Sequence, residues 1–449
     1  MSSTRTRGNR LRAAWVICGL TVVALVIYIS PVYVQPPNQA TGRRLLIKHN
    51  DFTQNKRVPN DGSEAQKVTG RSWNDPDLDL LHMEINEFLP NFKNPCWYEN
   101  IYSPDIYQEN GYAILSKHIR KSMVKLIQVW EYRLSKSVPA RRLRCLPYFL
   151  IIGQPKCGST DLYSKIAMHP DVVTPPIKEL HWWTRNRQGK NSKDKILFQH
   201  YVDMFDEAAL EIESHTIDTK EGRWDLHPLI TGEGSVSTLW DNVNWWHLPE
   251  NSNNSLLEPK YTNADYVHHV LPDVHLIVIM RDPTDRLYSD YLYFHKKSKS
   301  PVLFHSLAEH AVGVFRNCTK LYGIRSCVYN ASVISQAKMR LHIGIYSIYL
   351  RDWLKVFARD QILFLRLEDY AEDKVSTLRR VYKFLKLGPI DDKRETVIRE
   401  TPDVNKRKPV LKALGNMLPK TRRMLNKFYS VYNQQLATLL DDNRFLWNS

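Results

Sequence analysis

The strongest constraint on the fold is a short apolar run at residues 148–152, YFLII, which is followed at once by a loop of small residues. The run is rich in β-branched and aromatic residues and is bounded by Pro147 and Gly153, as is typical of a buried parallel strand. Residues 161–168 then read as a helix whose start faces the loop. A strand, a tight loop and a helix in this order predict an α/β fold with a P-loop-like parallel sheet flanked by helices.

The loop between this strand and this helix is a candidate anion site. Gly158 permits a tight turn with N–H groups pointing inward, and the start of the following helix attracts negative charge. Lys156 adds a mobile positive charge, and the hydroxyls of Ser159 and Thr160 add hydrogen-bond donors. Because serine rather than lysine follows Gly158, the loop is not a Walker A loop. On its own it is equally compatible with an ordinary strand-to-helix turn.

A second strand, at residues 275–280, ends in polar residues that suit a second anion site. Open α/β sheets bind ligands at the carboxyl ends of their strands. Arg281 lies there and can hold a phosphate with two parallel hydrogen bonds, while Ser289 on the following helix can return a hydroxyl to the same group. The alternative for Arg281 is a salt bridge to Asp282 or Asp285.

Other segments complete the expected domain. Residues 361–365 predict a third strand, and residues 421–440 predict the last helix. Residues 112–134 place apolar side chains at helical spacing and predict an amphipathic helix that packs on the domain, with a membrane-surface helix as the alternative. The basic run at residues 406–408 either closes over a ligand or is a solvated surface.

Four motifs together resemble the PAPS-dependent carbohydrate sulfotransferases of the Golgi: QPKCGSTDLY, IKELHWWTR, RDPTDRLYSDYLYF and LRLEDY. The resemblance covers roughly residue 91 to the C-terminus. It implies the sulfotransferase fold and the co-substrate 3′-phosphoadenosine 5′-phosphosulfate (PAPS). It assigns the 5′-phosphosulfate to the first loop, at Lys156, Cys157, Gly158, Ser159 and Thr160. It assigns the 3′-phosphate to the second site, at Arg281 and Ser289.

The reaction implied by the resemblance moves a sulfuryl group to a sugar hydroxyl by in-line displacement. Lys156 and the helix start would stabilise charge on the leaving phosphate. Glu179 is the candidate general base, because it follows a strand-like segment at residues 172–174 and lies between a cation and a histidine. An alcohol is far less acidic than a carboxylic acid of pKa about 4.3, so the base must take the proton as the new bond forms. His181 would orient that base or contact the acceptor.

The residues around Glu179 are the candidate acceptor site. Lys178, Arg185 and Arg187 suit carboxylates or sulfates of the acceptor, against the alternative of a solvated surface. Trp182 could stack on a sugar, as could Trp183, against the alternative of packing in the core. Within the family the motifs look closest to enzymes that sulfate the 6-hydroxyl of N-acetylgalactosamine 4-sulfate, which implies chondroitin or dermatan sulfate as the acceptor.

The charge of the chain agrees with a polyanionic partner. Lys and Arg outnumber Asp and Glu by 63 to 47, which favours nucleic acid, an anionic membrane or acidic glycans without choosing among them. The resemblance selects the glycan, and no nucleic-acid partner is expected. Another glycosaminoglycan such as heparan sulfate, or a non-catalytic glycan-binding membrane protein, remains the alternative. The oligomeric state stays open, a homodimer included.

The N-terminal region predicts a membrane anchor. Residues 13–29 carry no charge and follow four arginines, so a helix across residues 13–33 could span a bilayer with its N-terminus in the cytosol. A cleaved signal peptide is the alternative, but residues 27–31 lack the usual pair of small residues. We therefore expect a cytoplasmic tail at 1–12, the anchor, a stem at 34–85 and a catalytic domain at 86–449 in the Golgi lumen, in single-pass type II topology.

A lumenal domain would lie in an oxidising compartment, where cysteines pair. Cys318 and Cys327 are close in sequence and form the best local pair, in keeping with a similar loop in related sulfotransferases. Cys96 and Cys145 would form the second pair. Cys157 would then be free and buried.

Two further features concern the surface and metals. Glycosylation sequons occur at Asn253, Asn317 and Asn330, which suits surface loops of a secretory-pathway protein. Glu179 and His181 are too few for a zinc site, and no other motif with metal-ligand spacing is present. We expect no metal requirement, because a sulfuryl group in transfer has less charge to neutralise than a phosphoryl group.

Overall fold

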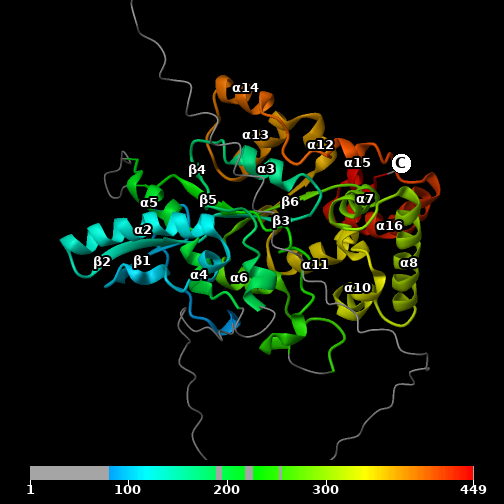
Figure 1. Ribbon diagram of the computed structural model, residues 1–449, viewed down its shortest axis with the longest axis horizontal. Coiled ribbons are helices and arrows are strands. Elements are labelled where there is room, and N and C mark those ends of the chain that lie inside the picture. The colour runs from blue at the N-terminus through cyan, green and yellow to red at the C-terminus, as the bar shows by residue number, and fades with distance from the viewer. Residues whose placement is uncertain (1–79, 189–194, 218–225, 252–254, 448–449) are drawn as a thin grey trace, which may run out of the picture. The chain divides into compact units, whose positions relative to one another are not determined.

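A five-stranded parallel sheet forms the centre of the protein, with the strand order β4-β5-β3-β6-β7 (Figure 1). The computed structural model describes residues 80–188, 195–217, 226–251 and 255–447. The strands expected near residues 148, 172, 275 and 361 are confirmed, and one further strand, β5, joins them. The strand bounds are β3 Phe149–Gly153, β4 Val172–Val173, β5 Ile230–Glu233, β6 His275–Met280 and β7 Ile362–Arg366.

The two central strands are apolar because both faces of the sheet are covered. All residues of β3 are buried, and Leu276 to Met280 of β6 are fully buried. Successive side chains of a strand point to opposite faces, and here they enter two separate cores. One core contains Leu150, Ile152, Leu276, Val278 and Met280, and the other contains Phe149, Ile151, Ile277 and Ile279.

Helices cover each face of the sheet. The core that contains Phe149 also takes in apolar residues of α3 (Ser159–Ile166) and α13 (Lys374–Phe384), which contact each other. The core that contains Leu150 takes in residues of α6 (Asn263–Val270) and α11 (Tyr346–Val356). Figure 1 shows α3 and α13 above the sheet and α6 and α11 below it.

The remaining helices follow the chain order around this frame. The expected last helix is confirmed as α16 (Pro419–Leu440), which begins with proline in its first turn and buries Leu425, Phe428, Leu436 and Leu440. α7 (Pro283–Phe294) follows β6 directly. The others are α4 Phe198–Asp203, α5 Asp206–Ser214, α8 Pro301–Thr319, α9 Ile324–Tyr329, α10 Ala331–Ala337, α12 Leu367–Glu372, α14 Asp392–Glu400 and α15 Pro409–Lys412.

The single amphipathic helix expected over residues 112–134 is two helices. α1 (Gly111–Leu115) ends at Ser116, whose extended backbone breaks the helix and whose hydroxyl caps α2 (Lys117–Lys136). α2 buries the expected apolar face against the domain. The break leaves Ile114 and Leu115 64% and 62% exposed, so these two residues do not extend the buried face.

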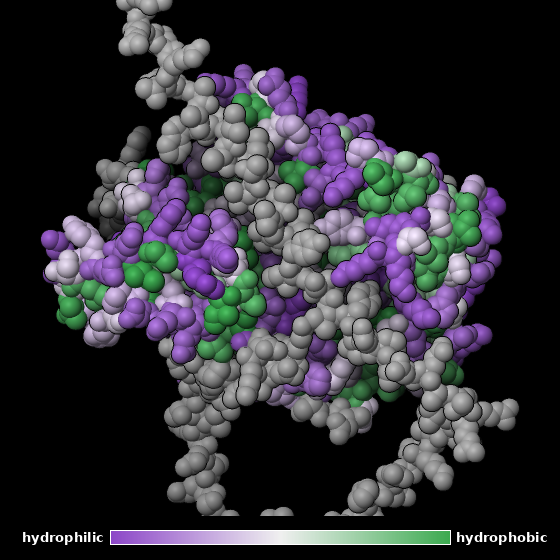
Figure 2. Space-filling model, viewed as in Figure 1, coloured by the Kyte–Doolittle hydropathy of each residue, from purple (hydrophilic) through white to green (hydrophobic). Residues whose placement is uncertain are grey.

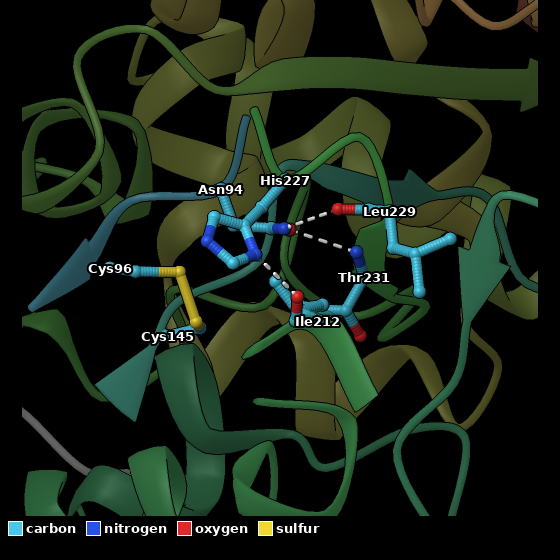
Figure 3. Close-up of a disulfide and its surroundings, with 7 residues drawn as sticks. All are labelled: Asn94, Cys96, Cys145, Ile212, His227, Leu229 and Thr231. Atoms are coloured by element: carbon cyan, nitrogen blue, oxygen red, sulfur yellow. Dashed lines mark hydrogen bonds between the residues drawn. A yellow bond between two sulfur atoms is a disulfide. The ribbon is translucent and has the colours of Figure 1, made fainter. Parts of the chain in front are cut away.

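Both expected disulfides are present, and Cys157 is free and buried. Cys96 and Cys145 join β1 (Cys96–Ile101) to its antiparallel neighbour β2 (Ala140–Cys145). Figure 3 shows this disulfide beside Asn94, whose side chain donates to the carbonyl of Leu229 and accepts from the N–H of Thr231, at 2.8 Å each. The two-stranded sheet of β1 and β2 is thus tied to the chain around β5. The Cys318–Cys327 disulfide links α8 to α9.

The expected stem and anchor lie mostly outside the described residues. Leu80 and Met83, which the sequence suggested as stem, are buried against the domain, and the carbonyl of Met83 is 3.0 Å from the Nε2 of His269 on α6. Packed chain therefore begins before residue 86. Among the described residues, no helix is both long enough and apolar enough to cross a membrane.

The sequons occupy different settings. Asn253 lies outside the described residues. Asn330 is exposed and caps α10, accepting from the N–H of Val333 at 3.1 Å. Asn317 is also exposed but lies within α8 rather than in the expected surface loop, because the helical pattern of α8 continues to Thr319.

Candidate active site

The first anion loop is held in a tight turn between β3 and α3. Gly158 has a φ of 83°, and a Cβ atom there would lie 2.7 Å from Cδ1 of Leu367. Only glycine fits both the angle and the space. The helix begins at Ser159, two residues earlier than expected, so Ser159 and Thr160 lie in its first turn, where backbone N–H groups lack partners within the helix.

Lys156 stands over an aromatic ring at this loop. Its Nζ lies 3.6 Å from the centre of the Tyr293 ring, a cation–π contact. Burial lowers the pKa of Lys156 to about 8, against the effect of the Asp290 carboxylate and together with that of the Arg340 guanidinium. The lysine is therefore still mostly charged at neutral pH, and an anion bound beside it would raise its pKa.

Arg281, at the end of β6, does not form the salt bridges that were its alternative explanation. The Asp282 carboxylate instead caps α7 by accepting from the N–H of Thr284 at 2.7 Å. Asp285 pairs with Arg422 at 2.5 Å. Within the described part of the chain, the guanidinium of Arg281 has no hydrogen bond or ion pair.

Arg281 lies near the first loop, because its charge acts on Cys157. Burial raises the pKa of the Cys157 thiol to about 12, and Arg286 and Arg281 oppose that rise because their charges lie near the sulfur. Cys157 is fully buried, so its side chain supports the loop rather than facing a ligand. Ser289 lies half-buried in the middle of α7.

The carboxylate of Glu179 is engaged on both oxygens. Lys178 Nζ lies 2.7 Å from one oxygen, and His181 Nε2 lies 3.4 Å from the other. Burial would raise the pKa of Glu179, but Lys178 and His181 outweigh it and hold the pKa well below its usual range. The carboxylate is therefore ionised, as a general base must be.

His181 is held by a serine as well as by the base. Its Nδ1 lies 2.7 Å from the hydroxyl oxygen of Ser237. Burial lowers the pKa of His181, and the charge of Arg185 adds to this effect although Glu179 opposes it. A neutral ring that donates from Nε2 to Glu179 accepts from Ser237 at Nδ1, which fixes both the orientation of the ring and its tautomer.

The backbone around the base is bent in an unusual way. Glu179 and His181 have φ angles of 68° and 52°, in the left-handed region that side chains other than glycine rarely adopt. Each such residue costs on the order of 1–3 kcal/mol and persists only where surrounding contacts hold it. Leu180 between them is fully buried, and its carbonyl accepts from the Tyr112 hydroxyl at 3.0 Å.

Further contacts that the sequence did not suggest come from the end of β5. Glu233 is 2% exposed, and its carboxylate accepts a hydrogen bond from the hydroxyl of Ser235. The same hydroxyl oxygen accepts the backbone N–H of His181 at 2.8 Å. β5 went unpredicted because its sequence, ITGE, contains a glycine and a charge and has no apolar run or alternation.

The structure places the three candidate catalytic residues within reach of one another's charges: His181 lies beside Glu179, and Glu179 acts on Lys156. Burial raises the pKa of Tyr293, whose ring contacts the ammonium of Lys156, and the charge of Glu179 adds to that rise. Glu179 also raises the pKa of Lys156. The loop between β3 and α3 thus contacts α7 at Tyr293, and the charge of Glu179, which follows β4, reaches both residues. An anionic donor beside Lys156 and a hydroxyl beside Glu179 would be neighbours there.

The expected tryptophan contact with the acceptor is wrong, because Trp182 lies in the core. It is 2% exposed, donates from Nε1 to the carbonyl of Ile196 at 2.8 Å, and stacks on Tyr201 with ring centres 5.1 Å apart. Trp183 is equally buried and donates to the Tyr201 hydroxyl at 3.1 Å. Both rings therefore pack, and neither has a free face for a sugar.

The three cations near the base occupy different environments. Lys178 is largely buried, and its Cε would lie 3.1 Å from a Cβ atom at Gly234, so the glycine gives the lysine its space. Arg185 is 48% exposed and lies 3.4 Å from Asp241. Arg187 lies over the ring of Tyr266, 4.2 Å from its centre. Arg185 is thus the most accessible of the three.

The remaining charged motifs have partners of their own. Glu368 accepts from the N–H of Asp282 at 3.0 Å and so supports the turn after β6. Lys406 pairs with Asp403 at 3.1 Å, and Arg407 lies over the Tyr288 ring, 5.6 Å from its centre. Within the described ranges, no group of three or more His, Cys, Asp or Glu side chains could hold a metal ion.

Comparison with known proteins identifies the family. The sulfotransferase domain model matches residues 146–413. Carbohydrate sulfotransferase 15 from mouse is 41% identical over 392 residues, covering 83% of this chain and 70% of that protein, and the human protein has the same identity and coverage. A solved sulfotransferase from Alicyclobacillus acidocaldarius aligns with 20% identity and a TM-score of 0.42, covering 66% of this chain and 97% of that one. The chain therefore belongs to the sulfotransferase family.

Proposed function

We propose that the protein is a PAPS-dependent glycosaminoglycan sulfotransferase that sulfates the 6-hydroxyl of N-acetylgalactosamine 4-sulfate in chondroitin or dermatan sulfate. The observation that carries the proposal is the position of Lys156 over Tyr293, where the charge of Glu179 acts on both residues. A cation for the leaving phosphate and a base for the attacking hydroxyl are the two groups that in-line sulfuryl transfer needs.

The residues present fit the PAPS donor. The guanidinium of Arg281 makes no bond to any described residue, which leaves it available for the 3′-phosphate. Gly158 allows the tight turn that places the loop at the start of α3, where unpaired N–H groups suit a phosphate. Lys156, with the first turn of α3, would hold the 5′-phosphosulfate, and the donor supplies the sulfuryl group that is transferred.

The chain's own residues then have these roles. Glu179 accepts the proton of the acceptor hydroxyl as the oxygen bonds to sulfur. Lys178 and His181 keep that carboxylate ionised and fix its direction. Lys156 stabilises the negative charge that develops on the departing phosphate, and its pKa of about 8 keeps it charged at neutral pH.

Support for the acceptor comes from two sources. The first is the similarity to carbohydrate sulfotransferase 15 at 41% identity. The second is a basic surface on α2, where the exposed lysines Lys117, Lys121 and Lys125 recur on one side of the helix. Figure 2 shows mostly hydrophilic residues, with small hydrophobic patches, over the part of the surface where α2 lies. A linear polyanion suits such a surface.

The proposal also includes a Golgi membrane protein of type II topology with a lumenal domain. The two disulfides support an oxidising compartment for the domain. Glycosidase treatment of the full chain in sealed vesicles should lower its mass only after the vesicles are opened. Sequons without sugar, together with a C-terminus open to protease in intact vesicles, would contradict the topology.

Transfer of labelled sulfate from PAPS to a panel of defined glycosaminoglycans tests the function directly. Disaccharide analysis of chondroitin 4-sulfate after reaction should find the 4,6-disulfated unit. Product on heparan sulfate or on unsulfated chondroitin instead would retain the sulfotransferase and reject this acceptor. Binding of adenosine 3′,5′-bisphosphate without transfer to any glycan would favour a non-catalytic glycan-binding protein.

A further inference from the structure

The backbone that carries the base is strained, and something must hold it. Glu179 and His181, which are separated by one residue, both adopt left-handed φ angles although neither is glycine. Such conformations persist only where several surrounding contacts determine them. The contacts of this bend therefore control where the Glu179 carboxylate points.

One of these contacts comes from the end of a neighbouring strand. The N–H of His181 donates to the Ser235 hydroxyl oxygen at 2.8 Å, and Ser235 donates in turn to the Glu233 carboxylate. Glu233 and Ser235 are 2% and 1% exposed, so water cannot replace either bond. The chain from Glu233 to His181 thus links β5 to the bend directly.

The environment of Glu233 indicates a role beyond ordinary packing. Isolated buried carboxylates are costly, and burial raises the pKa of Glu233 to about 7. The Ser235 hydroxyl, the charge of Lys178 and the backbone N–H of Leu180 oppose that rise, but among the described residues no arginine or lysine forms an ion pair with it. Ser235 donates its hydroxyl to Glu233, and the same hydroxyl oxygen accepts the N–H of His181 in the bend. The buried carboxylate therefore helps to position the segment that carries the base.

We propose that Glu233 and Ser235 are positioning residues, a hydrogen-bonded clamp that holds the strained bend at Glu179–His181 and thereby aims the general base at the acceptor hydroxyl. Neither residue is assigned to the donor or the acceptor site. This inference rests on the proposed function in that Glu179 is taken as the base. The clamp requires only an accepting oxygen at residue 233, whichever protonation state the carboxyl group has.

The clamp makes an unusual prediction for substitutions at residue 233. Glu233→Gln keeps an accepting oxygen for Ser235 and should retain turnover, whereas Glu233→Ala removes it. Ser235→Ala removes the acceptor of the His181 N–H and leaves that group buried and unpaired. An unpaired buried donor typically costs about 1–3 kcal/mol, so kcat of Ser235→Ala should fall roughly tenfold to a hundredfold.

Binding should separate positioning from general damage. The clamp does not touch the donor loop, so KM for PAPS and the Kd for adenosine 3′,5′-bisphosphate should stay within about twofold in all three variants. Thr238→Val is the matched control, because Thr238 is buried in the same segment and its hydroxyl has no partner among the described residues. Its kcat should equal that of the parent.

Hydrogen exchange gives a readout that needs no acceptor. The amide of His181 should exchange at least tenfold faster in Ser235→Ala than in the parent or in Thr238→Val. Equal exchange rates, or kcat of both Ser235→Ala and Glu233→Ala within twofold of the parent, would overturn the clamp. So would a loss of kcat that accompanies an equal loss of adenosine 3′,5′-bisphosphate affinity, since that result indicates support of the whole fold.

Two outcomes distinguish this inference from the proposed function. A parent enzyme that transfers sulfate, with variants that behave like it, rejects the clamp alone. A parent enzyme that transfers sulfate to no glycan rejects the proposed function, and the exchange rate of the His181 amide then still decides whether Ser235 holds the bend. Glu233→Gln as inactive as Glu233→Ala would also reject the clamp, because charge rather than the accepting oxygen would then matter.

Discussion

Lys178 Nζ lies 2.7 Å from the Oε1 atom of Glu179, while His181 Nε2 lies 3.4 Å from Oε2. The lysine favours the ionised carboxylate electrostatically, and the neutral histidine fixes its direction. The resulting pKa of Glu179 lies well below the usual range, so the carboxylate stays ionised at every pH at which the protein would be assayed. Any acid limb in the rate profile must therefore belong to another group.

Glu179→Gln should abolish most turnover while preserving the donor site. The amide keeps the shape of the side chain but cannot take the acceptor proton, and general-base removal typically lowers kcat about 10²- to 10⁴-fold. Adenosine 3′,5′-bisphosphate should bind with unchanged affinity, as measured by calorimetry. Glu258→Gln is the control, since Glu258 is also a paired carboxylate, 3.0 Å from Arg325, but lies outside the site. Activity within a few-fold of the parent would assign the base elsewhere.

Arg281→Ala should weaken the donor through the 3′-phosphate. A charge-assisted hydrogen bond contributes about 1.5–3 kcal/mol, so the Kd for adenosine 3′,5′-bisphosphate should rise roughly tenfold to a hundredfold. Ser289→Ala should act in the same direction with a smaller effect, because a hydroxyl is uncharged. Arg422→Ala is the control, because Arg422 already pairs with Asp285 at the same helix start. Equal affinities for Arg281→Ala and Arg422→Ala would remove Arg281 from the donor site.

The central strands and the first loop were predictable because each depends on local sequence. β3 and β6 are continuous apolar runs, as strands buried on both faces must be. The residue types of Gly158 and Lys156 predicted the loop. The resemblance to the sulfotransferases implied the roles of Glu179 and Arg281. These features required no knowledge of what lies beside them in space.

The errors and omissions arise from tertiary contacts. Trp182 could not be assigned to the core by sequence, since an aromatic residue beside a base suits a sugar as well as it suits packing. β5 is a strand because its neighbours pair with it, and Gly232 is required there because the Phe149 ring occupies the place of its Cβ, at 2.2 Å. Glu233 therefore had no signal in the sequence that would mark it as part of the site.

Glu233→Gln should change how stability depends on pH. Burial raises the pKa of Glu233 to about 7, so the folded protein binds this proton more tightly than the unfolded chain, whose carboxyl titrates near 4.5. Stability is therefore lost as the pH rises from about 4.5 to about 7, by about 3 kcal/mol for this group. The glutamine variant should lack that loss.

Urea unfolding of the parent and of Glu233→Gln at pH 5 and pH 8 measures this effect. From pH 5 to pH 8 the free energy of unfolding of Glu233→Gln should rise relative to that of the parent. An exposed substitution such as Glu131→Gln on α2 should show no such relative rise. A gain of less than about 1 kcal/mol would show that the pKa of Glu233 in the folded protein lies close to that in the unfolded chain.

The last prediction concerns the length of the acceptor. α1 and the start of α2 lie near the segment that carries the base. Tyr112 on α1 donates its hydroxyl to the carbonyl of Leu180 at 3.0 Å, and Ile119 and Met123 of α2 line a small cavity together with Pro176. Lysines 117, 121 and 125 recur every four residues on the exposed side of α2 and have no acidic partner among the described residues. Neighbouring like charges at this spacing destabilise a helix slightly, and a bound polyanion would offset that cost.

Replacing these three lysines with glutamine should therefore raise KM for long chondroitin 4-sulfate chains severalfold and leave kcat unchanged. KM for a short oligosaccharide that fills only the active site should not change, and the difference between long and short acceptors should shrink as salt rises, because salt screens exposed charges. The matched control replaces Lys393, Arg394 and Arg399, which are exposed on α14, on the other side of the sheet from α6 and α11 (Figure 1). If both triple variants raise KM for long chains equally, the effect reflects overall charge and α2 has no particular part in holding the acceptor.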